Sequence, residues 1–447
     1  ILFFLFACKK SSMDDLVKVP ETPAVKDTTA KAPPPVVVIG KIVDVGTGSG
    51  DLSIDGKSLP LKCNDKIRIA KGSYKSITIK NIQAEDGCAI TVTNNGLVDI
   101  NGNFSQMNLS NLKGVIISGN GDPGIQYGFQ FHDNSYRSII ISKPYTSSTI
   151  QYVSFKNIQD YVISYDPKTV YDGSEGSYSK NLKFLNIRCE NTSSFLQFPG
   201  SVENGPIIGL IKGLEIANLT FVNSSKVGTV VWIGNVEDYD VHNNRVDNIN
   251  TENNNHNGIF HFMGNGKFHD NYVSNHQGNA LRAWTYSIGT PKEVLIYNNI
   301  VVNSRKYSAF ETQSFENYMR GSVTYANAKV YNNTCGNLNL NKDWYGNVVD
   351  VYNLEGGTCQ VFNNIGFNFP APNPVTLISN QQSVTKPTES NNLYFTSIDE
   401  VGFSDKTTFK LNSSSTAKNK GQAILSLLKD YYGVARNVNK PSIGAVE

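Results

Sequence analysis

A short pattern of apolar and polar positions recurs along most of the chain, from Ile77 onward. It reads apolar, any residue, apolar, any residue, asparagine, as in "LEIANL" (214–219), "VLIYNN" (294–299) and "CQVFNN" (359–364). Alternation with a period of two is typical of a β-strand with one buried face, and asparagine is a common turn residue. Each copy therefore predicts a strand that ends in a corner.

The asparagines of this pattern recur at similar intervals along the chain. They are Asn157, Asn186, Asn218, Asn244, Asn271, Asn299, Asn333, Asn364 and Asn392. A strand-and-turn unit that repeats roughly every 20–50 residues is the sequence signature of a solenoid, whereas sandwiches show turns about every 8–12 residues. We therefore predict an all-β fold, a single-stranded right-handed parallel β-helix in which each coil stacks on the one before it.

The repeated asparagine has a physical reason in such a fold. At a corner, an amide that points inward can bond its own backbone and also the equivalent amides in the coils above and below. The repeat therefore predicts a ladder of asparagine side chains inside one corner of the solenoid.

The chain begins with "ILFFLFAC", an apolar run that ends at Cys8 and is followed by "KKSSMDD". This resembles the end of a bacterial lipoprotein signal peptide, and the acidic residues after it are similar to the surface-export signal of Bacteroidetes lipoproteins. The resemblance implies lipidation of Cys8 and a place at the outer membrane, on the cell surface or in the periplasm. Residues 1–8 are then a signal remnant, 9–38 a flexible Pro/Thr/Ala/Lys linker, and 39–447 the β-helix domain.

Both ends of the predicted domain resemble known β-helix proteins. "DKIRIAKGSYKSITIKNI" (65–82) is similar to the first coil of pectate-lyase-like proteins. "LLKDYYGVARNVNKPSIGAVE" (427–447) is similar to the "D-x-x-G-x-x-R … I-G-A-x-E" terminus of secreted bacterial β-helix proteins. Residues 421–432 predict a short C-terminal helix that caps the open end of the solenoid.

Four cysteines form two pairs, each with a spacing close to one coil. The pairs are Cys63 with Cys88, and Cys335 with Cys359. Either pair is a candidate disulfide in an exported protein, and buried reduced thiols are the alternative. Cys189 is expected to be buried, and no spacing of cysteine and histidine indicates zinc.

Charged residues make up 17% of the chain and the net charge is +2, so no basic field suited to nucleic acid is present. No stretch after the N-terminal run is long and apolar enough to cross a bilayer. A surface rich in Asn, Ser, Thr and Tyr suits a sugar-facing β-structure. We expect a polysaccharide partner, contact with a membrane only through the lipid, and a monomer.

A second strand follows each asparagine, and aligning these strands predicts a column of outward side chains. In "ALRAWT" (280–285), Leu281 and Ala283 point into the core, so Arg282 between them points out. The predicted column is Gln130, Ser164, Gln197, Val231, His261, Arg282, Glu311 and Asp350. With rungs ~4.8 Å apart, the last four would span about 15 Å of a groove that faces water.

Those last four, His261, Arg282, Glu311 and Asp350, are the predicted catalytic residues, because consecutive ionisable groups are unusual in a chain with so few charges. The predicted substrate-binding residues are Trp284, Tyr352, Gln313, Lys306 and Gln197, with Met263 as a further flank of the groove and Arg305, His256, Trp344 and Tyr345 as rims. The alternative is a stabilising ladder of ion pairs across the rungs. Asp350 beside Glu311 argues against that as the whole explanation, because adjacent like charges destabilise a sheet.

One function for this column is β-elimination of a uronate-containing polysaccharide, which needs a group that neutralises the carboxylate, a base and an acid. "ALRAWTYS…EVLIYNN" resembles the arginine strand of polysaccharide lyase family six, the chondroitinase B and alginate lyase group, which implies that Arg282 is the cationic partner. The chain departs from that family in the preceding coil, where it has His261 and a displaced Lys267 in place of the matching lysine. The acidic pair that would bind calcium is not evident, so calcium would have to be held by Glu311, Asp350 or nearby Asn carbonyls.

Two alternatives stay open. Glu311 and Asp350 on adjacent rungs would place their carboxyl groups about 5 Å apart, near the separation of a retaining glycoside hydrolase. A surface lipoprotein that binds glycan without catalysis, or a structural adhesin, is the other alternative, because solenoids offer long surfaces and a fold does not dictate a function.

Overall fold

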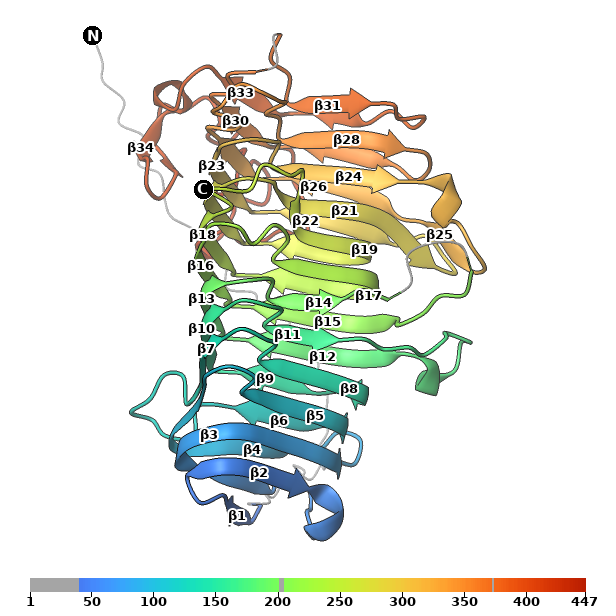
Figure 1. Ribbon diagram of the computed structural model, residues 1–447. Coiled ribbons are helices and arrows are strands. Elements are labelled where there is room, and N and C mark those ends of the chain that lie inside the picture. The colour runs from blue at the N-terminus through green and yellow to red at the C-terminus, as the bar shows by residue number, and fades with distance from the viewer. Residues whose placement is uncertain (1–39, 201–204, 372–373) are drawn as a thin grey trace, which may run out of the picture. The chain divides into compact units, whose positions relative to one another are not determined.

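The computed structural model describes residues 40–200, 205–371 and 374–447 (Figure 1). They form a parallel β-solenoid of about 12 turns, which confirms the predicted all-β fold. Each turn contributes one strand to each of three sheets, here called sheets I, II and III, and each strand pairs in parallel with the equivalent strand of the next turn. The described residues contain no α-helix, and four short 3-10 turns are the only helical elements among them, η1 (Gly56–Ser58), η2 (Glu175–Ser177), η3 (Glu316–Tyr318) and η4 (Asp399–Val401).

The strands that belong to one sheet follow each other once per coil. Sheet I contains β2 (Ser49–Asp55), β5 (Gln106–Lys113), β8 (Ile139–Thr146), β11 (Ile163–Tyr165), β14 (Leu196–Phe198), β21 (Asn279–Ile288), β24 (Phe310–Ser314), β28 (Val349–Leu354) and β31 (Ile378–Gln381). Sheet II contains β1 (Ile42–Val45), β6 (Val115–Ser118), β9 (Thr149–Gln151), β12 (Ser179–Leu185), β15 (Ile211–Ala217), β22 (Glu293–Tyr297), β26 (Asn327–Tyr331), β29 (Cys359–Phe362) and β32 (Thr388–Ser390). Sheet III contains β7 (Phe129–Asn134), β10 (Val153–Ile158), β13 (Arg188–Thr192), β16 (Thr220–Ser224), β18 (Arg245–Ile249), β20 (Tyr272–His276), β23 (Ile300–Ser304), β27 (Thr334–Gly336), β30 (Ile365–Phe367) and β33 (Leu393–Phe395).

Four long strands bend round a corner and serve more than one sheet: β3 (Lys66–Gln83), β4 (Ile90–Asn101), β17 (Val231–His242) and β19 (Gly258–His269). Outside the three sheets, β25 (Val323–Tyr325) pairs antiparallel with β21, and β34 (Phe403–Asp405) pairs with β35 (Lys410–Leu411).

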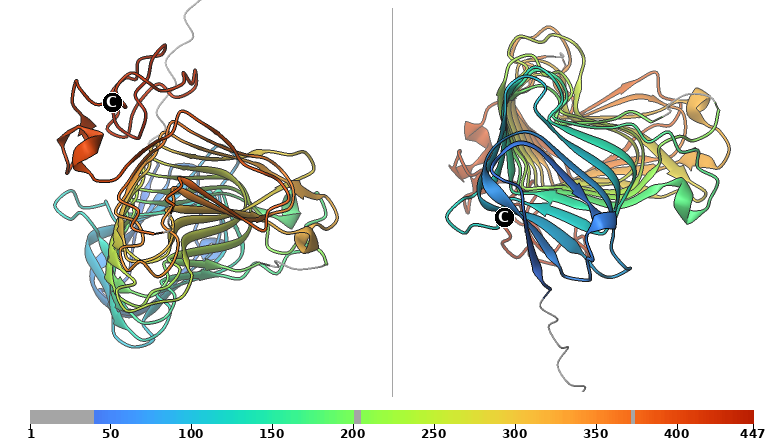
Figure 2. Two further views of the ribbon diagram at one scale, coloured as in Figure 1. Left: turned by 90° about the horizontal axis from the view of Figure 1, so that it is seen from above. Right: turned by 60° about the horizontal axis from the view of Figure 1, so that its bottom comes forward.

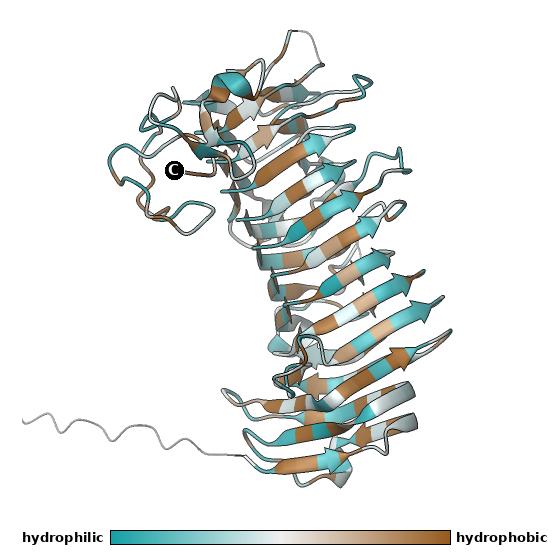
Figure 3. Ribbon diagram, turned by 90° about the vertical axis from the view of Figure 1, so that its left-hand side faces the viewer, coloured by the Kyte–Doolittle hydropathy of each residue, from teal (hydrophilic) through white to brown (hydrophobic). Residues whose placement is uncertain are grey.

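The three sheets enclose the interior of the coil (Figure 2). Side chains that point inward from the sheets fill this interior. In sheet I, Phe260, Leu281, Phe310 and Val349 lie on successive rungs in register, and none of them is exposed. Burial of each such side chain contributes about 1.5–3 kcal/mol, so this column alone gives the register a strong preference. Figure 3 shows the resulting alternation of hydrophobic and hydrophilic positions along the strands.

A ladder of asparagines, buried except for its last member Asn392, runs inside the corner between sheets II and III. Its members are Asn244, Asn271, Asn299, Asn333, Asn364 and Asn392. In each of the first five, the side-chain Nδ2 donates to the Oδ1 of the next at 2.9–3.0 Å. The backbone N–H of each of the first five donates to the same Oδ1, so this oxygen fastens one coil to the next through two bonds. The predicted ladder is confirmed for these six residues.

The three earlier repeat asparagines do not belong to this ladder. Asn186 and Asn218 have positive φ and bond each other at the surface. Their strand register makes them equivalent to Asn243, the residue before the first ladder member Asn244. Asn157 lies near the end of β10 in sheet III and bonds Asp133 instead. The prediction was wrong here because strands of different sheets end in the same apolar-x-apolar-x-Asn pattern.

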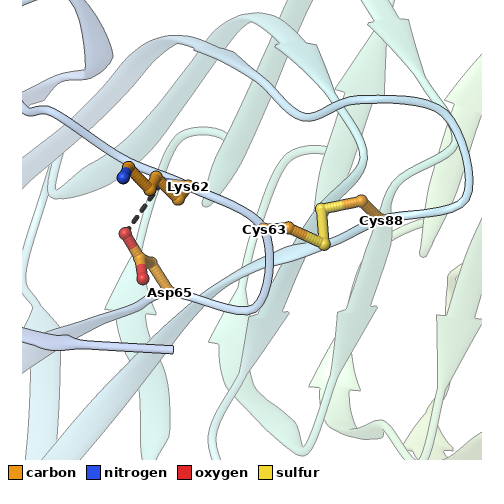
Figure 4. The surroundings of a disulfide bond; sticks show 4 residues. All are labelled: Lys62, Cys63, Asp65 and Cys88. Carbon is orange, nitrogen blue, oxygen red and sulfur yellow. Dashed lines mark hydrogen bonds between the residues drawn. A yellow bond between two sulfur atoms is a disulfide. The ribbon is translucent and has the colours of Figure 1, made fainter. Parts of the chain in front are cut away.

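The two cysteine pairs have different outcomes. Cys63 and Cys88 form a disulfide between the turns that precede β3 and β4, with a Cα–Cα distance of 5.5 Å (Figure 4). Their spacing equals the coil length at this point, where Lys66 faces Thr91 on the next rung. Cys335 and Cys359 are buried free thiols, as is Cys189.

Cys335 and Cys359 do not meet because the coil there is longer than their spacing. Cys335 in sheet III faces Gly366 on the next rung, and Cys359 lies in sheet II opposite Ala328. Cys359 therefore comes too early in the chain to lie on the rung next to Cys335. It lies in sheet II, whereas Cys335 lies in sheet III.

The predicted C-terminal helix is absent, since residues 421–432 form turns and irregular structure. Leu425 and Leu428, which a capping helix would bury, are 87% and 58% exposed. The backbone of Gln422 bonds the side chain of Asn363, so the segment is held by the solenoid rather than by its own helical bonds.

The C-terminal segment covers the side of the coil rather than its open end, and lies beside β23 and β30 in Figure 1. Its apolar residues Val401, Phe409, Ile443 and Val446 pack against outward residues of sheet III, Ile300, Val302, Ile365 and Phe367. Arg436, the arginine of the terminal motif, is buried and donates to Asn298 Oδ1 at 2.8 Å and to the carbonyl of Gly444. The terminal motif therefore has a structural role in this chain: it fixes the C-terminal segment to the solenoid.

Within residues 40–200, 205–371 and 374–447, no helix is long and apolar enough to cross a membrane. Cys8 and the predicted linker 9–38 lie outside the described residues, and the lipid anchor stays a prediction.

We expect Asn299→Ala to destabilise the solenoid strongly. Asn299 is fully buried, donates to Phe268 and Asn333, and accepts from Asn271. Leaving these buried groups without partners should cost at least about 2 kcal/mol. Thermal unfolding followed by circular dichroism would show a lowered midpoint, with the exposed Asn254→Ala as the control that changes it little. Equal midpoints for both variants would contradict a stabilising ladder.

The cysteine assignment predicts a specific labelling pattern. In denaturant without reductant, an alkylating reagent should label Cys189, Cys335 and Cys359, and should label Cys63 and Cys88 only after reduction. Peptide mass spectrometry reads this directly, and a peptide that links Cys335 to Cys359 would refute the assignment.

Candidate functional site

The outer face of sheet I carries the predicted row of ionisable residues on successive rungs. His261 faces Arg282, Arg282 faces Glu311, and Glu311 faces Asp350. We call these four residues the charged column. Their strand register agrees with the alignment made from sequence, while their catalytic roles stay predictions.

Two other members of the predicted column are wrong. His261 is preceded by Trp232, not Val231, because Trp232 faces both Gln197 and His261. The strand "TVVWIG" was aligned one residue too early, since its run of apolar residues gives no alternation to fix the phase. Gln130 lies in sheet III opposite Asp99, so it does not belong to this wall at all.

Glu311 is the centre of the column and is fully buried. Its Oε1 lies 2.9 Å from Arg282 Nε and also accepts from the Gln313 amide, and its Oε2 lies 2.7 Å from His256 Nε2. Burial would raise the pKa of Glu311, but the charge of Arg282 and the bond from His256 hold this pKa below its ordinary value. Glu311 is thus an ionised carboxylate with both oxygens engaged.

Asp350 has the opposite environment. Asp350 is 4% exposed, and it lies one rung from the negative charge of Glu311. Burial and the Glu311 charge raise the pKa of Asp350 to about 7, against an ordinary 3.8. Two neighbouring carboxyl groups with separated pKa values are typical of acid–base sites.

His261 lies between two tryptophans of the same wall. Its ring centroid is 4.2 Å from that of Trp232 and 5.0 Å from that of Trp284. Burial, with the positive charge of Arg282, places the pKa of His261 well below its ordinary value, so the ring is neutral at pH 7. Its Nε2 and the Nε1 of Trp284 are buried and have no hydrogen-bond partner among the described residues.

His256, predicted only as a rim residue, is part of the site. Its ring stacks on Tyr307 with centroids 4.0 Å apart, and its side chain is 33% exposed. Its Nε2 lies near two acceptors, Glu311 Oε2 and, at 3.0 Å, Asn279 Oδ1. Nε2 must therefore carry a proton, so in the neutral tautomer that these contacts select, Nδ1 is the proton acceptor.

Aromatic residues border the column on both sides. On the side of His256, Lys306 Nζ lies 5.4 Å from the ring centre of Tyr307 and 5.5 Å from that of Trp344. Trp344 and Tyr345 are 42% and 37% exposed. On the other side, Trp284 packs against Phe315 and Tyr318 from the loop that contains η3.

The remaining predicted residues have mixed positions. Gln197 is half-buried and faces Trp232, and half-buried Tyr352 faces Gln381. Gln313 is used to bond Glu311 and is almost unexposed. Arg305 donates to the carbonyls of the turn before His256, at Asn250 and Asn253, so it supports this turn rather than lining a groove.

The expectation that the column faces water is wrong for most of its members. Glu311, Asp350 and His261 are buried, and the Arg282 side chain is 14% exposed. The cause is the loops at the strand ends, which the strand pattern does not describe. They bring His256 and Tyr307 over the column. Gln313 lies on β24 itself and bonds Glu311 two residues away on the same strand.

The residues of the column do not fit a calcium ion. Both oxygens of Glu311 already accept from Arg282, His256 or Gln313, and a divalent cation there would be repelled by the Arg282 guanidinium. Among the residues that the structure describes, no group of three or more His, Cys, Asp or Glu side chains is arranged to hold a metal.

The raised pKa of Asp350 predicts how stability depends on pH. The folded protein keeps this proton up to about pH 7, whereas the unfolded chain releases it near 3.8, so stability falls as pH rises through this range. Asp350→Asn removes the penalty, so it should raise the unfolding midpoint markedly at pH 8 and less at pH 5. The difference in stability between the two pH values is up to a few kcal/mol, because each pKa unit is worth about 1.4 kcal/mol.

The control for this measurement is Asp238→Asn, an exposed carboxylate that should change the midpoint little at either pH. A destabilised Asp350→Asn protein at pH 8 would show that the carboxylate is held in its charged form.

Comparisons with known proteins concern the fold alone. No protein-family model and no curated protein matches the chain. Among solved structures it is similar to pectate lyase Pel9A, with 12% identity, TM-score 0.42, and coverage of 90% of this chain and 97% of that one. It is also similar to a PL6 family polysaccharide lyase from Pseudopedobacter saltans (13%, TM-score 0.41, 83% and 97% covered) and to the PL6 family alginate lyase AlyGC (14%, TM-score 0.39, 77% and 51% covered). At this level of identity the similarity carries no inference about a substrate.

Proposed function

We propose that the protein cleaves a uronate-containing polysaccharide by β-elimination at the outer face of sheet I. One observation carries the proposal: the buried carboxylate of Glu311 holds Arg282 and His256 side by side, with the protonatable carboxyl of Asp350 on the next rung. A buried acid that orients a histidine is the arrangement that fixes the tautomer of a general base.

The three requirements of the reaction have candidate residues here. Arg282 supplies positive charge where the uronate carboxylate gains electron density, and Nδ1 of His256 accepts the C5 proton. The C5–H electron pair forms the C4=C5 double bond, the bond from C4 to the leaving oxygen breaks, and Asp350 gives that oxygen a proton. Glu311 is a positioning residue in this account.

The other enzyme candidate is less well supported. A retaining hydrolase would need Glu311 as a nucleophile, yet this carboxylate is unexposed and both of its oxygens are engaged. Glycan binding without catalysis draws support from the aromatic borders, since Trp344 and Tyr345 offer exposed ring faces to sugars.

For the cellular setting, we propose an exported lipoprotein that is anchored through Cys8 and bound to no nucleic acid. The anchor is supported by the N-terminal sequence alone, and the lack of a nucleic-acid partner by the low charge of the chain.

Incubation with alginate, chondroitin and pectate tests the reaction, because elimination creates unsaturated ends that absorb ultraviolet light. We expect absorbance to rise with one of these polymers. His256→Gln should lower the rate by about 10²–10⁴-fold, the range for a lost general base. Arg282→Ala should lower it as well, through loss of the positive charge.

The matched control is His132→Gln, which removes a histidine bonded to Asp99 and Asp133 on sheet III and should leave the rate unchanged. New reducing ends without absorbance would indicate hydrolysis, and retention on a polymer without either product would indicate a binding protein. Each of these two outcomes contradicts the proposal.

A further inference from the structure

A cleft lies at the corner between sheets I and II, three coils before His261. The ends of β8 and β11 form its inner wall, and residues 166–178, an insertion between β11 and β12, form its outer wall. Its lining includes Pro144, Tyr145, Tyr165, Pro167, Tyr178 and Lys180. The open space is about 520 Å³, within the range of about 300–1,000 Å³ that is typical of ligand sites.

The outer wall of this cleft is fixed to the next coil. The backbone N–H of Tyr171 donates to the carbonyl of Ile207 at 2.8 Å, and that of Gly209 donates to the carbonyl of Thr169 at 2.9 Å. Lys212 Nζ lies over the ring of Tyr178, 4.6 Å from its centre. The cleft is therefore formed before a ligand binds.

The hydroxyl group of Tyr145 needs a partner in this cleft. Tyr145 lines the cleft and is 1% exposed, and its hydroxyl has no hydrogen-bond partner within the part of the chain that the structure describes. The hydroxyl of Tyr165, by contrast, bonds Ser179 Oγ at 2.7 Å. Buried hydroxyl groups are nearly always bonded, and the hydroxyl groups of a sugar offer both a donor and an acceptor.

Two ion pairs border the cleft. Lys113 Nζ lies 2.8 Å from Asp86, and Lys180 Nζ lies 3.1 Å from Glu175. The Asp86 side chain is 85% exposed and is attracted by both lysines, so its pairing is weak and easily exchanged. A carboxylate carried by a ligand can therefore take the place of Asp86, whereas a wholly apolar ligand would leave these charges and the Tyr145 hydroxyl without partners.

The cleft is connected to the charged column by one row of sheet I. Ser164, beside Tyr165, faces Gln197, which faces Trp232, and Trp232 faces His261. Three rungs of ~4.8 Å give a distance of about 14 Å along this row. Gln197 and Trp232 are half-buried, so a ligand can contact both. An extended polysaccharide bound at the column can reach the cleft, and a single sugar cannot occupy both places.

We propose that the cleft is a remote subsite that binds one acidic sugar unit of the same polysaccharide chain. This inference rests on the proposed function and adds that the substrate must be long. A sugar hydroxyl bonds the hydroxyl of Tyr145, and the sugar carboxylate replaces Asp86 beside Lys113 and Lys180. The apolar face of the sugar ring packs on the tyrosine and proline side chains of the wall.

A variant that fills the cleft tests the subsite. Gly176 lines the cleft, has an ordinary φ and has open space where a side chain would start, so Gly176→Trp can fold and block it. The control is Gly124→Trp, in an exposed turn between β6 and β7. The probes are disaccharides and long oligosaccharides of alginate, pectate and chondroitin. Calorimetry is done in the His256→Gln background, in which cleavage should be slow.

We expect one long oligosaccharide to bind about 10-fold or more weakly to Gly176→Trp and equally well to Gly124→Trp, with its disaccharide unaffected by either change. A long oligosaccharide that binds Gly176→Trp as tightly as the control would overturn the inference. So would a failure of all three to bind the protein with an open cleft.

Tyr145→Phe tests the buried hydroxyl by itself. Because this hydroxyl bonds no described protein group, its removal should not lower the unfolding midpoint, but should weaken binding of the long oligosaccharide about 10-fold, the value of one hydrogen bond. Tyr239→Phe is the matched control, since it removes another buried hydroxyl without a described partner, on β17 outside the cleft. Equal affinities of the two variants would show that the ligand does not meet Tyr145 and would contradict the subsite.

The two proposals fail in different ways. Elimination with the same KM in Gly176→Trp and in the native protein would refute the subsite and leave the reaction. Binding that Gly176→Trp weakens, with no product from any polymer, would refute the reaction and leave the subsite.

Discussion

Hydrogen bonds between buried asparagines connect successive coils at one corner of the solenoid. Each Oδ1 from Asn271 to Asn392 accepts two bonds from the coil before it, so the coils are fixed in height and in phase at this point. Inward columns such as Phe260, Leu281 and Phe310 fix the same register in sheet I. Each strand residue is therefore stacked on the equivalent residue of the next coil, even where the two side chains repel each other.

The site follows from this enforced stacking. Glu311 and Asp350 are placed on adjacent rungs, where two ionised carboxylates would repel each other. Arg282 and His256 stabilise the charge on Glu311, and Asp350 keeps its proton to about pH 7. The fold thus produces an ionised and a protonatable carboxyl from two side chains that would have similar pKa values in water.

The features that could be predicted from the sequence are those that depend on strand periodicity. Features that depend on other properties of the chain were not predicted. The solenoid, the six-residue ladder and the register from His261 to Asp350 follow from alternation, which each of these strands preserves. Trp232 was missed because the residues around it, 230–233, form an unbroken apolar run without alternation. Pairing of Cys335 with Cys359 was not decided by spacing, because the coil that contains them is longer than the coil that joins Cys63 to Cys88.

Loops explain the other differences. The role of His256 and the burial of Glu311 depend on turns whose conformation no pattern predicts, although "NNNHNG" does show a polar turn before the strand. A carbon-13 NMR titration of Asp350 in the native protein and in Glu311→Gln tests the central claim most directly. The account predicts a pKa near 7 in the native protein and a lower one in the variant. A value near 3.8 in the native protein, or no change in the variant, would contradict it.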